Sequence, residues 1–417
     1  MVTFVRRRRA GTGEDRPSVL IIVQNLPVPL DRRVWLECEA LTAAGYQVSV
    51  VCPKGAGEPK FDVLDGVTLY KYRPYRAARG KADLVAEDAY SLVMTAWLVA
   101  KAWRRQPFQV MQTCNPRDVF WPIGLVFRIM SGGTFVFDQH DLCPELFESR
   151  YPDGARWLYR AVSFLEACTF RVASHVISTN NSYRAIAIER GRKRPEDVTV
   201  VRSGPDASRL RRGPPEPALK RGRKFLAAYL GVMGPQDGVD VAVRAAAVIV
   251  HDLGRTDISF TFMGAGDCLA DLIALRDELG LQDYVEFSGR VPDEFVFAVL
   301  STADLGLSPD PKNPLNDLST MNKTIEYMAF ELPVVAFELR ETRVSAGGAA
   351  LYVEPSDPDL FAKAIVELLD DEPGRRAMGA LGRERVENEL AWHHQRSRYV
   401  EVYDRIVGRQ PQVALSL

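Results

Sequence analysis

The stretch Asn322-Lys323-Thr324-Ile325-Glu326-Tyr327-Met328-Ala329 has a helical pattern, and the apolar run Leu332-Pro333-Val334-Val335-Ala336 follows it almost at once. A helix that leads directly into a continuous β-branched run is typical of a parallel sheet covered by helices on both faces. The pattern extends outward on both sides, because Leu305–Ser308 and Ala350–Val353 also read as strands. The sequence therefore predicts an α/β fold.

The same alternation of strands and helices runs through most of the chain in two arrays. The first array has strands predicted at 19–23, 48–52, 108–112, 135–138, 175–178 and 198–201, and the second at 225–230, 258–263, 285–288, 305–308, 333–337 and 350–353. A stretch rich in Pro, Gly, Arg and Lys, residues 204–224, separates them and is typical of a linker. Each array predicts a doubly wound sheet, in which ligands bind beyond the carboxyl ends of the strands. With two facing domains, the natural site is the cleft between them.

These patterns set the expected domain bounds. We expect a disordered basic tail over residues 1–17, which contain Arg6-Arg7-Arg8-Arg9, and a first domain over 18–205. A linker over 206–224 and a second domain over 225–390 follow, and residues 391–417 form a helix that we expect to pack back on the first domain.

Composition excludes several classes of function. The 417 residues carry a formal net charge of -1, so a general affinity for nucleic acid is not expected. The six cysteines are scattered singly and the histidines show no zinc spacing, which predicts reduced thiols, a cytoplasmic protein and no metal. No apolar run approaches the length of a membrane span, although a peripheral position at the inner face of the cell membrane stays open.

Five short motifs in order give the chain a family resemblance. They are Phe262-Met263-Gly264-Ala265-Gly266-Asp267, Val285-Glu286-Phe287-Ser288-Gly289-Arg290-Val291, Ala303-Asp304-Leu305-Gly306-Leu307-Ser308-Pro309, and the helix and strand motifs quoted first. Together they resemble the C-terminal domain of glycosyltransferase family 4, and Asp31-Arg32-Arg33-Val34-Trp35 resembles the family's first βαβ unit. The resemblance covers roughly residues 18–400.

The resemblance implies a fold and a reaction. The fold is GT-B, in which two facing Rossmann-like domains enclose a cleft. The reaction is transfer of a hexosyl or N-acetylhexosaminyl group from a nucleotide-sugar to a hydroxyl acceptor, with retention and without metal or cofactor. Similarity to members that act in bacterial surface polysaccharide assembly favours a UDP-sugar donor, with a GDP-sugar possible, and a lipid-linked or saccharide acceptor.

The donor side of the expected site begins with Lys323 and Glu326. A helix N-terminus attracts phosphate, and Lys323 would add a full positive charge there. The resemblance gives Glu326 the ribose hydroxyls and places Arg290 beside the nucleobase. Gly264 and Gly266 would let the donor approach the backbone.

Two departures from the family pattern affect this side of the site. The family's second glutamate would stand at position 318, which is Leu318, and we expect Asp317 to replace it beside the donor sugar. The family's Arg and Lys after the first strand of this domain are absent from Gly231-Val232-Met233-Gly234-Pro235-Gln236-Asp237-Gly238. Lys323, Arg202 and backbone N–H groups near Gly234 and Gly238 are the candidates to bind the diphosphate.

The acceptor side has candidates with weaker support. His140 follows a predicted strand and matches a family histidine that contacts donor sugar or acceptor, so we treat it as catalytic with Asp317 and Lys323. Asp141 and Glu145 in the following loop are acceptor candidates. Arg32 and Arg33 would meet an acceptor phosphate, and the alternative for them is an ordinary capped helix.

Three alternatives stay open at the level of the sequence. The apolar helix at 89–105, with Lys101, Arg104 and Arg105 at its end, could lie on a membrane surface or pack in the core. The chain could be a nucleotide-sugar epimerase of GT-B fold, although the predicted cleft is poor in acid–base groups. It could also be a degenerate member that binds a nucleotide-sugar or a partner enzyme without turnover.

Overall fold

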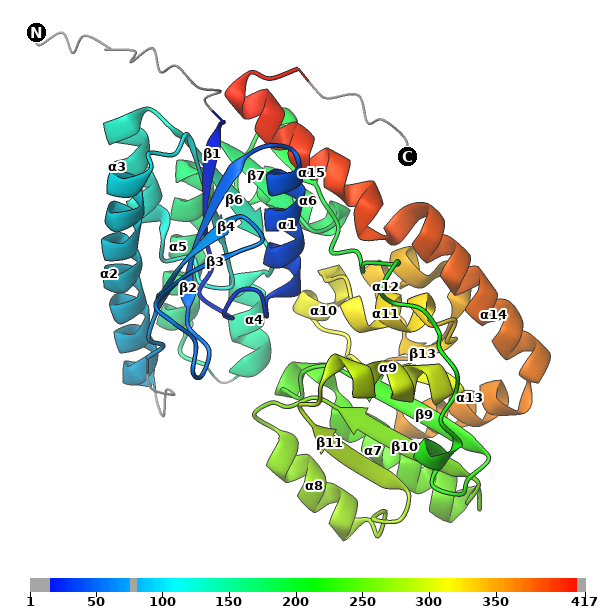
Figure 1. Ribbon diagram of the computed structural model, residues 1–417. Coiled ribbons are helices and arrows are strands. Elements are labelled where there is room, and N and C mark those ends of the chain that lie inside the picture. Colours follow the sequence, from blue (N-terminus) through cyan, green and yellow to red (C-terminus); the bar gives the residue numbers. More distant parts are fainter. Residues whose placement is uncertain (1–15, 76–80, 153, 411–417) are drawn as a thin grey trace, which may run out of the picture. The chain divides into compact units, whose positions relative to one another are not determined.

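The computed structural model describes residues 16–75, 81–152 and 154–410 (Figure 1). The expected basic tail therefore falls almost wholly outside the described residues. The chain divides into two compact units. Unit 1 is formed by the chain up to Val136, by Val172–Ser174 and by the chain from Val400 onward, and unit 2 by Phe137–Arg171 and His175–Tyr399.

The strands of the first half form one sheet with the order β3-β4-β2-β1-β5-β6-β7-β8. Its strands are β1 (Ser18–Ile22), β2 (Gln47–Pro53), β3 (Phe61–Leu64), β4 (Val67–Tyr72), β5 (Val110–Cys114), β6 (Thr134–Gln139), β7 (His175–Ser178) and β8 (Val198–Val200). β1 pairs in parallel with both β2 and β5, whereas β3 pairs antiparallel with β4 at the edge. The helices of this half are α1 (Arg32–Ala43), α2 (Lys81–Arg105), α3 (Trp121–Ser131), α4 (Cys143–Arg150), α5 (Arg156–Val172) and α6 (Asn181–Glu189).

The strands of the second half form an all-parallel sheet with the order β11-β10-β9-β12-β13-β14. Its strands are β9 (Phe225–Leu230), β10 (Ile258–Met263), β11 (Val285–Gly289), β12 (Leu305–Ser308), β13 (Val334–Phe337) and β14 (Ala350–Val353). Numbered from β9, this is the order 3-2-1-4-5-6 of a doubly wound nucleotide-binding sheet. The predicted α/β class and its two parallel arrays are confirmed.

The second half of the chain contributes the remaining helices. They are α7 (Val239–Ala247), α8 (Leu269–Glu278), α9 (Asp293–Thr302), α10 (Pro314–Leu318), α11 (Asn322–Ala329), α12 (Arg340–Ala346), α13 (Pro358–Asp370), α14 (Glu372–Arg385) and α15 (Trp392–Val407). π-helical turns at Val248–Asp252 and Val386–Leu390 extend α7 and α14.

The core of the second sheet lies on both of its faces. Along β9, Phe225, Ala227 and Tyr229 belong to one buried cluster, and Leu226 and Ala228 belong to the other. Successive side chains of a strand point to opposite faces, so both faces of β9 are covered. This double burial is why the strand is apolar throughout rather than alternating.

The end of the chain packs within unit 1. On α15, Asp404 accepts a hydrogen bond of 2.7 Å from the hydroxyl of Tyr46, and the Tyr403 hydroxyl donates to Gln112 of β5. The helix predicted to return to the first array therefore contacts the loop before β2 and the strand β5. None of the helices in the described part of the chain combines the length and the apolarity needed to cross a membrane.

Candidate functional site

The candidate site lies where the strand order of the second sheet reverses. β9 lies between β10 and β12. The connection after β9 leads to β10 on one side and the connection after β12 leads to β13 on the other, so the two connections diverge. Such a switch point is the place where doubly wound sheets bind ligands. Gly231 follows β9, and Pro309 and Asp310 follow β12.

The loops after β9 and β10 run close together because two glycines allow it. Gly264 has a φ of 139°, and a Cβ there would lie 1.8 Å from the carbonyl oxygen of Gly231. A Cβ on Gly266 would lie 2.4 Å from the carbonyl oxygen of Met233. The N–H of Met233 donates to Ala265, and that of Cys268 donates to Met233. The two glycines therefore serve a close contact between the two loops, and the predicted approach of a donor to this backbone stays a prediction.

Helix α11 carries Lys323 to this point and is fixed there by a tyrosine. The Tyr327 hydroxyl accepts a hydrogen bond from the N–H of Leu230, at the end of β9, and donates to the carbonyl of Leu307 in β12. Lys323 lies one turn before Tyr327, on the same side of the helix. Its side chain therefore enters the space beyond the ends of β9 and β12.

The Lys323 ammonium is surrounded by acidic and aromatic groups. Its Nζ lies 2.5 Å from Oδ1 of Asp310 and 3.8 Å from Oδ1 of Asp237, and 5.0 Å from the centre of the Tyr229 ring. The side chains of Lys323 and Asp310 are only 9% and 1% exposed. The second oxygen of Asp310 accepts a hydrogen bond of 2.6 Å from Ser308. Asp310 is thus held by β12 and positions the lysine.

Burial and neighbouring charges shift the pKa values of the groups in this cluster. Burial opposes the charged form of Lys323, but Asp310, Tyr229 and Asp237 outweigh it and hold its pKa well above the ordinary value. Burial raises the pKa of Asp237, and Lys323 opposes that shift only in part. Burial also raises the pKa of Tyr229. The cluster therefore combines the lysine ammonium, the Asp310 side chain that pairs with it, and Asp237, a second acidic group whose pKa burial raises.

Arg290 lies at the carboxyl end of β11, on the same side of the second sheet as Gly231 and Asp310. Glu326 lies on α11 beyond Lys323 and is half-buried, and Arg290 is exposed directly after β11. Gly234 precedes a short 3-10 turn, Pro235–Asp237, and its N–H donates to Oδ2 of Asp237 at 2.9 Å. That N–H is therefore already engaged within the loop.

The carboxylate predicted to replace the missing glutamate has a structural partner. Oδ1 of Asp317 accepts a hydrogen bond of 3.0 Å from the N–H of Arg340, the first residue of α12. Leu318, where the family has glutamate, packs in a small apolar cluster with Leu142, Tyr183 and Leu315. The change from glutamate to leucine therefore matches an apolar environment at this position.

Arg202 contacts α12 and is not part of the cluster formed by Lys323, Asp310, Asp237 and Tyr229. Its Nη1 is 4.0 Å from Oε2 of Glu341, whose other oxygen accepts a hydrogen bond of 2.6 Å from Ser182. The described contacts thus bring Lys323, Gly231 and Gly264 together, and they place Arg202 in a separate group.

His140 has an orienting carboxylate that sequence reasoning missed. Its Nε2 lies 2.6 Å from Oδ2 of Asp138, and both residues stand at the end of β6, where Asp138 is buried. An imidazole held by a buried carboxylate is the arrangement of an oriented acid–base group. The signal was available, since Asp138 lies two residues before His140 on the same strand face.

The acceptor candidates differ in their surroundings. Glu145 forms ion pairs with Arg190, which also binds Glu166 at 2.7 Å. Asp141 is half-buried and acts electrostatically on Tyr183. In unit 1, Asp31 caps α1 through the N–H of Val34, as predicted.

The two arginines at the start of α1 also differ. Arg32 is exposed. Arg33 is nearly buried, and its Nε lies 3.1 Å from Oε1 of Glu37.

A further cation lies close to the loops after β9 and β10. Arg150 ends α4, and its Nη2 is 3.8 Å from Oδ2 of Asp267 in the loop after β10. Its positive charge acts to lower the pKa of Asp237, but burial has the larger effect and the pKa is raised. The sequence did not point to Arg150, because α4 is short and weakly amphipathic and its contact with these loops is a tertiary one.

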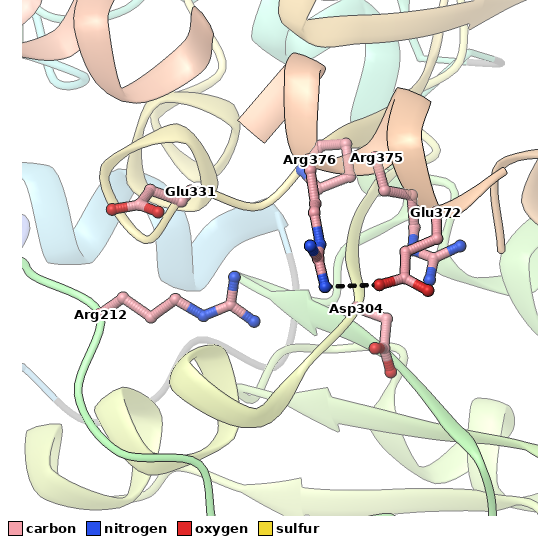
Figure 2. Close-up of a pocket in the computed structure, with 7 residues that line it drawn as sticks. Arg212, Asp304, Glu331, Glu372, Arg375 and Arg376 are labelled. Carbon is pink, nitrogen blue, oxygen red and sulfur yellow. Dashed lines mark hydrogen bonds and ion pairs between the residues drawn. The ribbon is translucent and has the colours of Figure 1, made fainter. Parts of the chain in front are cut away.

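A pocket of about 490 Å³ lies at the opposite edge of the second sheet (Figure 2). Asp304 and Pro333, which line it, directly precede β12 and β13, so it opens at the amino ends of the strands. Its charges neutralise one another, since Arg376 lies 2.5 Å from Glu372 and Asp304 binds Lys220 at 2.8 Å. It offers no excess positive charge to a diphosphate.

Comparisons with known proteins match both halves of the chain. A family model described as "Glycosyl transferase 4-like domain" matches residues 30–204, and one described as "Glycosyl transferases group 1" matches residues 224–371. The chain is 25% identical over 343 residues to a 2-deoxystreptamine glucosyltransferase from Streptomyces kanamyceticus, with 80% of each chain covered.

Solved structures are similar in fold. Sucrose-phosphate synthase from Thermosynechococcus elongatus has a TM-score of 0.77 and 18% identity, and the match covers 94% of this chain and 100% of that one. Anabaena HepE in complex with UDP and glucose has a TM-score of 0.70 and 15% identity, with 94% and 100% covered.

Proposed function

Because the chain belongs to glycosyltransferase family 4 and has the GT-B fold, we propose that it moves a sugar from a nucleotide-sugar to a hydroxyl acceptor with retention at the anomeric carbon. We favour a UDP-sugar, which the complex of Anabaena HepE with UDP and glucose supports, and a GDP-sugar is the alternative. The transferred group is a hexosyl or N-acetylhexosaminyl unit. No metal or cofactor takes part in the proposed reaction.

The observation that carries this proposal is the buried Lys323 at the switch point. An ammonium held by Asp310 beyond the ends of β9 and β12 is placed where a doubly wound sheet binds phosphate. The departing nucleoside diphosphate gains negative charge as the glycosidic bond breaks, and a fixed cation in a water-poor site stabilises that charge. Glu326 binds the ribose hydroxyls in this scheme, and Gly264 and Gly266 give the donor access to the backbone.

The remaining groups act on the sugar and the acceptor. The acceptor oxygen attacks from the face that the nucleotide leaves, and its proton passes to the departing phosphate. His140, oriented by Asp138, binds the donor sugar or the acceptor. The proposed acceptor is a saccharide or a lipid-linked saccharide of bacterial surface polysaccharide synthesis, which would place the protein at the inner face of the membrane.

Product stereochemistry tests the reaction directly. The protein is incubated with an α-linked UDP-sugar or GDP-sugar and a panel of hydroxyl acceptors, and the anomeric configuration of the product is determined by NMR. We expect an α-linked product. A β-linked product would exclude retention, and epimerised free donor would favour an epimerase.

A binding protein without turnover is the second candidate, and one observation favours it. Lys323 faces two carboxyl groups, Asp310 and Asp237, and the family's Arg and Lys after the first strand are absent. Leaving-group stabilisation is correspondingly weaker than in a site with free cations. Slow release of nucleoside diphosphate from the donor in water alone would exclude this candidate, and donor binding with no release over hours would favour it.

A further inference from the structure

Two helices of unit 1 present exposed faces that are almost wholly apolar. On α3, the exposed side chains Leu125, Val126, Ile129 and Met130 recur at helical spacing, and Ile129 and Met130 are 75% and 83% exposed. The opposite side of α3 is buried, since Gly124 lies against Phe135 and Phe127 packs in an aromatic cluster. Core packing therefore explains the inner face of α3 and leaves the outer face unexplained.

Helix α2 repeats the pattern beside it. From Val85 to Trp103 every exposed residue is apolar, and these residues are Val85, Ala89, Val93, Ala96, Trp97 and Ala100. The ring of Trp103, near the end of α2, lies 5.9 Å from that of Phe127 on α3. The two helices are thus neighbours at the outer side of unit 1 (Figure 1). We call these exposed side chains of α2 and α3 the apolar face.

Positive charge borders the apolar face. The Lys101 ammonium lies 5.4 Å from the centre of the Trp97 ring, and the exposed Arg104 follows one turn later. Beyond Asp88, α2 contains no acidic residue, and α3 contains none at all. Within unit 2, α5 has an outer face of the same kind, where Trp157 and Phe164 are exposed between arginines and its one acid, Glu166, is buried.

We propose that the apolar face docks on an anionic phospholipid surface, with Ile129, Met130 and Trp97 entering the interface between headgroups and acyl chains. Clusters of exposed apolar side chains are candidates for interaction sites, and tryptophan with nearby cations is typical of membrane interfaces. A second copy fits less well, because α3 and the part of α2 beyond Asp88 offer no acidic residue to pair with Lys101 and Arg104 of the other copy. Docking would bring the protein to a lipid-linked acceptor. Only this purpose, and not the docking itself, rests on the proposed function.

Vesicle flotation tests the docking. Wild type is mixed with phosphatidylcholine vesicles, with or without phosphatidylglycerol, and the bound fraction is measured. We expect binding to the phosphatidylglycerol vesicles and a loss of at least about tenfold in Ile129→Asp/Met130→Asp, since each tenfold corresponds to about 1.4 kcal/mol. Lys101→Glu/Arg104→Glu should remove the preference for phosphatidylglycerol. Leu253→Asp/Leu360→Asp, at two exposed apolar residues of unit 2, is the control and should bind like wild type.

Three results would overturn the proposal. They are no flotation of wild type with phosphatidylglycerol, equal flotation of Ile129→Asp/Met130→Asp and wild type, or a wild-type dimer that the substitution converts to a monomer while neither protein floats. A thermal shift with nucleotide-sugar, measured on the same variants, shows that they are folded. It also separates failure of the docking from failure of the proposed function, because donor binding uses residues of unit 2.

Discussion

At the scale of single residues, the site depends on an ion pair that removes most of a lysine from water. Lys323 and Asp310 are both buried, so each is stable mainly because the other is present. The sequence predicted Lys323 from its place at a helix N-terminus. It could not predict Asp310 or Asp237 as partners, because the three residues come together only when β9, β12 and α11 are packed.

Removal of Lys323 should therefore affect stability and activity separately. Lys323→Met leaves Asp310 buried without its cationic partner and should lower the free energy of unfolding by about 3–5 kcal/mol. Lys323→Met/Asp310→Asn should recover most of that stability and still transfer no sugar. Urea denaturation and a transfer assay on both variants check this, and activity in the double variant would show that the ammonium is not needed.

Asp237 should make donor binding depend on pH. Burial raises its pKa above the ordinary 3.8, so it stays neutral to a higher pH than a free aspartate, and its ionisation adds negative charge beside the diphosphate. The dissociation constant of a UDP-sugar should therefore rise as the pH increases through this raised pKa. Calorimetric titration of wild type and Asp237→Asn checks the effect, because the asparagine variant should show a flat profile. An identical slope in both proteins would assign the titration to another group.

Arg150 is expected to supply part of the missing positive charge. Arg150→Ala should raise the donor KM by about tenfold and leave kcat within about twofold, because a contact to the diphosphate that is equal in ground and transition states acts on binding. Steady-state kinetics measure both constants. Arg209→Ala, which removes an exposed arginine from the segment between the sheets, is the control. A kcat effect without a KM effect would contradict this role.

At the scale of elements, apolar patterning rather than length decided which segments were predictable from the sequence. The strands β7, β9, β10, β12 and β14 lie where the sequence predicted them, because each contains apolar residues that pack in the core, and all but β14 are buried along nearly their whole length. β3 and β4 were missed, since β3 is an exposed edge strand and β4 buries Lys71 through an ion pair with Glu58. α4, α10 and α12 were missed because their sequences show no sustained apolar period, and such short helices gain their stability from tertiary contacts.

Gly264, where the loops after β9 and β10 touch, should not tolerate a side chain. Gly264→Ala places a Cβ 1.8 Å from the Gly231 carbonyl oxygen at a φ of 139°, which adds overlap to backbone strain of about 1–3 kcal/mol. Gly254→Ala has a φ of 64° and no atom within 4 Å of the added Cβ, so it should cost only about 1–2 kcal/mol. Urea unfolding of the pair measures the difference. Equal costs would mean that the loops separate easily.

At the scale of the whole molecule, the two halves repeat one topology. The orders β4-β2-β1-β5 and β11-β10-β9-β12 both place the first strand of the half at the centre, next to the point where the order reverses. The alternation of strands and helices in the sequence predicted two doubly wound sheets, but it did not predict the order of their strands. The sequence could not predict the partners of individual charged residues, because these pairs join segments far apart in the chain. Examples are Glu145 with Arg190 and Asp317 with the start of α12.

The most direct test of the central claim is calorimetric titration of nucleotide-sugars into wild type and Glu326→Ala, with Glu278→Ala on the exposed side of α8 as the control. A donor bound at the carboxyl edge of the second sheet should bind wild type and Glu278→Ala alike, and bind Glu326→Ala at least about tenfold more weakly, a loss of about 1.4 kcal/mol. Equal affinity for all three proteins would place the donor elsewhere. No binding by wild type would contradict the proposed nucleotide-sugar site.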